Sequence, residues 1–224
     1  MLTVNGFTVI VPPDWSLIDV ADDAADSAKA WADARVRGYS GQARRELRST
    51  LIASMRGLLT GLKGREGLAV LAPSGPLVNP FDGGMLVFRR LMAPDGTNVL
   101  DMVVATAAAD ASGTLLEGDV NVCLRTHQDV EVGDDAEAKV VAQLPPVAQD
   151  GLVANADGFA EVRATLGRRF QRHVRYQVGR PDLTDRWLDV TGSIAFFDQE
   201  DSRALAEAQM RLFDTIVGNL TWQG

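Results

Sequence analysis

The stretch that decides the fold is GSIAFFDQEDSRALAEAQMRLFDTIVGNLTW, residues 192–222. It opens with a strand of mixed polarity that carries Ile194 and Phe196. Residues 198–201 then supply a cap and an acidic first turn, which the helix dipole favours. The helix that follows shows one broad face, made by Leu205, Gln209, Leu212, Phe213, Ile216, Val217 and Leu220. All but one of these residues are apolar, so this helix must pack on something large, most simply a sheet.

The rest of the chain supplies that sheet and an early pair of helices. Residues 2–11 predict a hairpin turning at Asn5-Gly6, which Pro12 and Pro13 end because proline cannot donate to a strand ladder. The spacing of apolar residues predicts helices over residues 20–37, capped by Asp19, and over residues 41–62. Short apolar runs further on are interpreted as strands at residues 67–72, 84–92, 98–106, 114–124, 138–144, 168–178 and 186–197.

Short turns join most of these predicted strands, which implies antiparallel pairing. The clearest turns are residues 94–96, read as Pro-Asp-Gly between two strands, and residues 179–182 in the last hairpin. A strand run followed by a helix indicates the α+β class. We predict one domain, residues 1–224, with an antiparallel sheet of about six to eight strands packed against the C-terminal helix. Residues 20–63 form a helical hairpin insertion in this arrangement.

The two early helices carry opposite charge, so antiparallel packing would neutralise them. The charged residues are Asp22, Asp23 and Asp26 in the first helix and Arg44, Arg45, Arg48 and Arg56 in the second. The apolar seam of the second helix is Leu47, Leu51, Met55, Leu58 and Leu62. An exposed seam would predict a homodimer formed through the insertion. A basic amphipathic helix can also lie on a membrane surface, but a packed helical hairpin is the commoner outcome.

Bulk composition excludes several classes of protein. The net charge of −8 argues against a nucleic-acid binder, which needs a clustered positive surface. No run is long and apolar enough to span a membrane, and the start lacks the pattern of a signal peptide. A single cysteine, Cys123, excludes an internal disulfide and fits a reducing compartment. We expect a cytoplasmic protein, and the excess of arginine over lysine is typical of a GC-rich bacterium.

Both ends of the chain resemble a known family. The residues concerned are Phe7, Val9, Pro12, Pro13 and Trp15, then Phe213, Asp214, Ile216, Val217 and Leu220. An opening strand with this proline and tryptophan spacing and a closing helix of this type are similar to the Mog1/PsbP-like fold. The resemblance implies a non-enzymatic adaptor, chaperone-like binder or assembly factor, serving a secretion or cell-envelope pathway. These positions are core and turn residues, so the resemblance carries no catalytic site.

A second architecture fits the same order of elements. One strand, two helices, a run of strands and a long C-terminal helix is also the plan of the helix-grip (START-like) fold. That fold encloses a ligand cavity between its sheet and its helix. The alternative function is therefore a small-molecule-binding protein with such a cavity.

Catalytic and metal-binding signatures are missing from the sequence. There is no GxSxG, P-loop, GxGxxG, HExxH or CxxC motif. Cys123 and His127 lie four apart, but a strand at this position would hold them about 13 Å apart, too far for a nucleophile and its base. The acidic residues between 129 and 137 do not match a calcium loop. We predict no enzyme, no metal and no cofactor.

The candidate partner-contact patch lies in RRFQRHVRYQVGR, residues 168–180, and consists of Arg169, Arg172, His173 and Arg175. Alternation along a strand places Arg169, His173 and Arg175 on one face, which suits an acidic protein or an anionic ligand. The competing interpretation is a solvated face paired with neighbouring carboxylates, for which Asp185 and Asp189 are available. The sequence thus predicts a non-catalytic protein-binding role with another protein as the partner.

Overall fold

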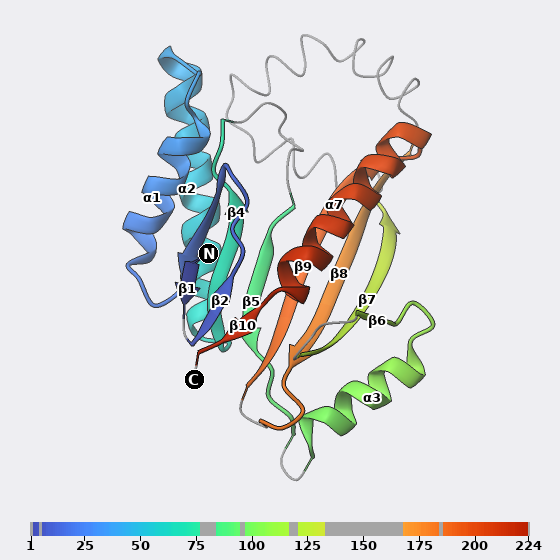
Figure 1. The fold of residues 1–224 in the computed structure, drawn as a ribbon. Helices are drawn as coiled ribbons and strands as arrows, with labels where there is room; N and C mark the ends of the chain where they lie inside the picture. The colour runs from blue at the N-terminus through green and yellow to red at the C-terminus, as the bar shows by residue number, and fades with distance from the viewer. Residues whose placement is uncertain are drawn as a thin grey trace.

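The computed structural model describes residues 2–4, 6–76, 84–94, 97–116, 121–132, 168–183 and 186–223. These residues form an α+β fold around a seven-stranded antiparallel sheet, which confirms the predicted class (Figure 1). In sheet order the strands are β3 (Trp15–Asp19), β4 (Gly67–Pro73), β5 (Leu86–Arg90), β9 (Trp187–Phe197), β8 (Arg169–Gly179), β7 (Val122–Glu131) and β6 (Thr114–Leu116). The strand predicted at residues 138–144 lies outside the described residues.

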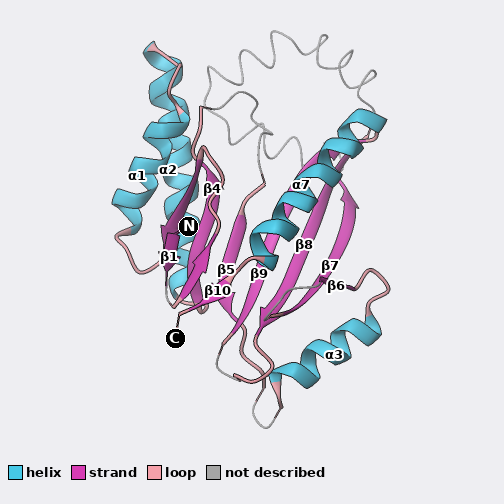
Figure 2. Cartoon of the chain, viewed as in Figure 1, coloured by secondary structure: helices cyan, strands magenta, loops and turns pink. Residues whose placement is uncertain are grey.

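The last hairpin forms the centre of the sheet. β8 pairs with β9 from Arg169↔Phe197 to Gly179↔Trp187, as its alternating pattern predicts. Helix α7 (Glu200–Gly218) follows and lies across β8 and β9, as Figure 2 shows. Its buried residues pack into the main core on this sheet face; they are Ala206, Met210, Phe213, Ile216 and Val217. The C-terminal helix packed on the sheet is therefore confirmed.

A small second sheet joins the two ends of the chain. β1 (Leu2–Val4) and β2 (Phe7–Val9) form the predicted hairpin, and Gly6 at its turn has φ of +86°, which favours glycine. β10 (Thr221–Trp222) adds to β2 by pairing Trp222 with Phe7. The Phe7 ring stacks on Phe88 of β5 with centroids 5.4 Å apart. This small sheet thereby covers the α7 side of the main sheet.

Residues 98–106 were predicted as a strand, and that prediction is wrong. Helix α3 (Val99–Ala109) occupies the segment, and Asn98 caps it by accepting a hydrogen bond from the Leu100 backbone N–H at 2.8 Å. Val99 and Val103, four residues apart, face one apolar cluster with Leu124. Alternation and helical spacing are hard to distinguish in so apolar a run, and the preceding proline turn favoured the wrong choice.

The first of the early helices begins later than predicted because a strand precedes it. β3 occupies residues 15–19 and pairs with β4, so Asp19 belongs to a strand and not to a helix cap. Asp23 caps α1 (Ala24–Arg35) instead by accepting from the backbone N–H groups of Ala25 and Asp26. Helix α2 (Gly41–Lys63) begins and ends within one residue of its prediction.

Helices α1 and α2 cover the face of the sheet opposite α7, near β3 and β4. Met55, Leu59 and Leu62 of α2 pack with Ile18 of β3 and Val70 of β4. An ion pair joins the two helices where Arg48 of α2 donates to Asp33 of α1 at 2.5 Å, although Asp33 is not one of the three aspartates predicted for this pairing. The leucines and the methionine of α2 are buried or half-buried, so the exposed seam that would predict a homodimer is not found in this helix.

The contact between α7 and the sheet generates a prediction. Replacing Phe213 with alanine should lower the free energy of unfolding by about 3–5 kcal/mol, because its fully buried ring fills the main core. Leu205→Ala on the same helix is the control and should change stability by less than about 0.5 kcal/mol, since that side chain is 70% exposed. Urea denaturation of both variants measures the difference, and equal losses would contradict this packing.

Candidate functional site

The four residues of the predicted contact patch do not share one surface. β8 alternates, so Arg172 points toward α7, whereas His173 and Arg175 point to the opposite face. The Arg172 side chain is only 8% exposed. Arg169 lies at the end of β8 beside a groove described below. A partner touching the outer face would therefore meet His173 and Arg175 but not Arg172.

Arg172 ties three elements together within the fold. It donates to both oxygens of Asp129 on β7, at 2.7 and 2.9 Å, and to Glu207 of α7 at 2.5 Å. Its guanidinium also lies over the Phe196 ring, 5.4 Å from the centroid. The hydrogen bonds from Arg172 hold the pKa of Asp129 below its usual value. These contacts give Arg172 a structural role.

The outer face of the sheet carries a different arginine arrangement. Asp189 of β9 is 5% exposed and accepts from Arg175 of β8 at 2.6 Å and from Arg89 of β5. The competing interpretation, in which Asp189 pairs with the patch, is confirmed for Arg175. Asp185 lies outside the described residues. His173, two positions from Arg175, is exposed on the same face.

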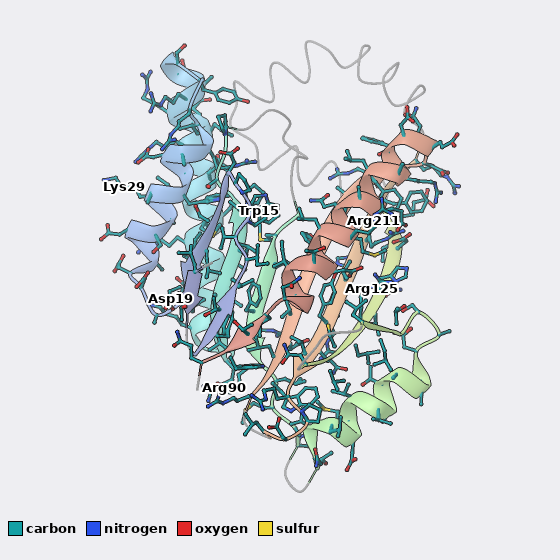
Figure 3. All side chains as sticks on the ribbon, in the orientation of Figure 1. Trp15, Asp19, Lys29, Arg90, Arg125 and Arg211 are labelled. Carbon is teal, nitrogen blue, oxygen red and sulfur yellow. The ribbon has the colours of Figure 1, made fainter. Side chains whose placement is uncertain are left out.

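A groove of about 610 Å³ lies beside the N-terminal half of α7. It occurs where the sheet is interrupted, because pairing of β5 with β9 ends at Leu86↔Gly192 while β9 continues to Phe197. Its walls come from α7, from the ends of β8 and β9, and from β3, α1 and the residues after β4. The main wall residues are Trp15 (labelled in Figure 3), Arg35, Arg169, Phe196, Leu205 and Leu212.

The apolar side of this groove comes from the broad face of α7. The predicted buried face of α7 includes Leu205, Gln209 and Leu212, and this prediction is wrong for the two leucines. Leu205 is 70% exposed and Leu212 is 36% exposed, and both line the groove. Ala206 and Phe213, each one position after one of these leucines, occupy the core instead. The apolar face of α7 is therefore wider than its contact with the sheet.

Hydrogen bonds fix the opposite wall. Arg35 of α1 is 6% exposed and donates from Nη1 to the Gly75 carbonyl at 3.0 Å. Trp31 donates from its indole N–H to the Pro73 carbonyl at 2.7 Å. The carbonyl of Asp14 accepts from the N–H of Gly75 at 2.9 Å. The segment after β4 is thereby held between α1 and the start of β3, so the groove has two well-supported sides.

Cys123, the one residue weighed above as a nucleophile, lies in the core. Cys123 is buried on β7, and this burial, with the nearby Asp214 carboxylate, raises the pKa of its thiol to about 12. His127 lies four positions along the same extended strand, so the two side chains are not adjacent. The interpretation of Cys123 as a buried core residue is confirmed.

A second, partly buried network joins β7, β8 and α7. Tyr176 donates to Oδ1 of Asp214 at 2.9 Å, and Arg125, labelled in Figure 3, donates to Oδ2 of the same carboxylate. Burial, and then the Asp214 charge, raises the pKa of Tyr176, so the phenol stays protonated as a donor. Both carboxylate oxygens are occupied, and this network serves to hold α7 against the sheet.

Within the described ranges, no group of three or more histidine, cysteine or acidic side chains could hold a metal ion. Asp134, Asp135 and Glu137 of the acidic run lie outside these ranges. None of the described helices has the length and apolarity required to cross a bilayer.

Comparisons of the chain with protein-family models, curated proteins and solved structures found no match.

The environment of Cys123 predicts its reactivity. At about pH 8 a thiol with so high a pKa is almost entirely protonated, and it is also buried, so N-ethylmaleimide should leave the native protein unmodified for hours. The same reagent should label one site promptly in denaturant. Mass spectrometry of both samples checks this, and rapid labelling of the native protein would contradict the buried position.

Arg172 generates a second prediction for this region. Arg172→Ala should lower stability by about 2–3 kcal/mol, less than for a fully buried pair because Asp129 and Glu207 stay partly solvated. Arg172→Met should recover part of this loss by packing on Phe196. Arg203→Ala, at an exposed ion pair, should cost less than about 1 kcal/mol.

The stabilisation from Arg172 should also depend on pH. Because the folded pKa of Asp129 is depressed, its contribution is present above the unfolded carboxyl pKa of about 4 and is lost as pH falls through the folded pKa. Urea titrations between about pH 7 and pH 3 should show the wild-type advantage over Arg172→Met shrinking at the acid end. A constant difference over this range would show that the carboxylate pairing contributes nothing.

Proposed function

We propose that this chain is a non-catalytic binding protein whose groove beside α7 receives an apolar segment of a partner protein. The proposal depends on one observation: Leu205 and Leu212 are both exposed, and both line the groove of about 610 Å³. Grouped exposed apolar side chains are costly in a protein that works alone, and they mark interaction sites. A partner segment would remove both leucines from water.

The other groove residues support a protein partner. Trp15 offers partly exposed aromatic surface, and Arg169 also lines the groove. Aromatic residues and arginine are enriched at protein interfaces, and they carry much of the binding energy there. Trp15 is already positioned by edge-to-face packing on Phe213, 6.3 Å between centroids. An aromatic side chain that is already held in place loses little conformational entropy when a partner binds.

The role beyond binding comes from the resemblance to Mog1/PsbP-like proteins. That group is largely non-enzymatic, so the proposed role is that of an adaptor or chaperone-like assembly protein in the cytoplasm of a bacterium. The buried cysteine agrees with a non-catalytic role, and so does the Tyr176–Asp214–Arg125 network, in which both carboxylate oxygens accept hydrogen bonds. The same resemblance supports the proposal that this role belongs to a secretion or cell-envelope pathway.

A small-molecule ligand is the second candidate, and the groove volume favours it. Ligand pockets span about 300–1,000 Å³, and 610 Å³ falls within that range. Such a ligand would lie beside α7, whereas the ligand of a helix-grip protein lies between the helix and the sheet. Phe213, Ile216 and Val217 fill the described contact between α7 and the sheet, so the available space lies beside the helix and not beneath it.

Affinity purification from native cells tests the proposed function. The double variant Leu205→Glu/Leu212→Glu should lose the partner recovered with the wild-type chain, because two charges would enter the apolar wall. Val104→Glu is the matched control, since Val104 is 60% exposed on α3, away from the groove. Quantitative mass spectrometry of the co-purified proteins gives the readout.

Three other results would overturn the protein-partner proposal. The first is equal recovery of the partner with both variants, which would place the contact elsewhere. The second is a small molecule released from the denatured wild type but not from the double variant, which would establish the second candidate. The third is a wild-type complex that sedimentation shows to be a second copy of this chain.

A further inference from the structure

A second pocket, of about 330 Å³, lies on the opposite side of the sheet from α7. Helix α2 forms one wall, and β5 and β9 form the floor. Its principal residues are Gly57, Gly61, Arg65, Val87, Arg89 and Thr191. A Cβ built at Gly57 or Gly61 would meet no atom within 4 Å, so both glycines border open space. We call this the arginine pocket.

Positive charge is concentrated at the arginine pocket. Arg65 and Arg89 line it, and Arg175 lies one strand further on, joined to Arg89 through the shared Asp189. Arg65, Arg89 and Arg175 carry three positive charges and Asp189 carries one negative charge, so these four side chains have an excess of two positive charges. This local excess stands out in a chain with a net charge of −8. Such a field attracts anions and raises their local concentration.

Asp189 positions these arginines for a ligand. It is 5% exposed and accepts from both Arg89 and Arg175, so it fixes two guanidinium groups in place. Arg89 and Arg175 nevertheless remain 35% and 47% exposed, and each retains donors that Asp189 does not use. Holding the guanidinium groups in advance lowers the entropy lost when an anion binds.

The donors at the pocket have the chemistry of an oxyanion site. The Nε–H of Arg89 is buried and has no acceptor within the described part of the chain. Buried donors of this kind are normally satisfied, often by water or an ion. Thr191 adds a hydroxyl donor on the floor. Guanidinium groups bind phosphate oxygens by paired hydrogen bonds, which a lysine cannot reproduce.

We propose that the arginine pocket binds a small phosphate monoester. The excess of two positive charges matches the phosphate dianion better than a carboxylate, which carries one negative charge. The volume lies at the small end of ligand pockets, which suits a phosphate with a short organic group. Val87 and Leu58 provide apolar surface for that group. This site is separate from the groove beside α7 and does not depend on the function proposed for it.

Isothermal titration calorimetry with phenyl phosphate at low salt tests the proposal. We expect saturable binding that is weaker by about tenfold or more in Arg65→Gln, which removes a charge-assisted contact. Gly61→Leu should also abolish binding, because the leucine side chain would fill the pocket. The substitution should not destabilise α2, since leucine has a higher helix propensity than glycine. Arg45→Gln and Ala53→Leu are matched controls at exposed positions of α2 and should bind like the wild type.

Each remaining result has a defined meaning. Shifts of the Gly57, Gly61 and Thr191 amide signals on titration would place the ligand in the pocket and support the proposal. If benzoate, a monoanion, bound with the same affinity as phenyl phosphate, the proposal that the ligand is a dianion would be overturned. Weakening by Arg45→Gln as large as by Arg65→Gln would show non-specific attraction and overturn the site. Binding of polyglutamate without binding of phenyl phosphate would assign this surface to an acidic protein instead.

Discussion

The contact between Phe213 and the backbone of Gly192 is the constraint on which the rest of the structure depends. A Cβ at Gly192 would lie 3.0 Å from the Phe213 ring and 2.9 Å from Leu86, so a side chain there would push α7 off the sheet. With glycine, the ring rests on the strand beside Leu86 and Ile194. The seating of α7 in turn decides which of its residues enter the core and which line the groove.

Much of this fold follows from sequence patterns that have a single physical interpretation. The last hairpin combines long alternation with a turn, and α7 combines an acidic start with an apolar face, so both were predictable. Residues 98–106 were not, because an almost wholly apolar run satisfies both periods and only the contact with Leu124 selects the helix. The strand at residues 15–19 is short and became recognisable only through its pairing with β4.

The candidate sites depend on tertiary arrangement to a greater degree. Alternation in β8 is enough to separate Arg172 from His173 and Arg175, but burial of Arg172 depends on Asp129 and Glu207 from two other elements. The groove exists because β5 is shorter than β9, which no local pattern encodes. Likewise, Arg65 and Thr191 line one pocket only because α2 packs over this part of the sheet. Charge and residue type were visible in the sequence, whereas their convergence was not.

The pairing of β10 with β2 has a consequence for the order of folding. Thr8 pairs with Thr221, so the small sheet joins residues that lie far apart in the sequence. Contacts between such distant residues carry a large loop-closure entropy and slow folding. During synthesis the β1–β2 hairpin has no third strand, and Phe7 lacks its Trp222 neighbour, until residue 222 has left the ribosome. The β1–β2 hairpin is thus completed by a strand that is synthesised much later.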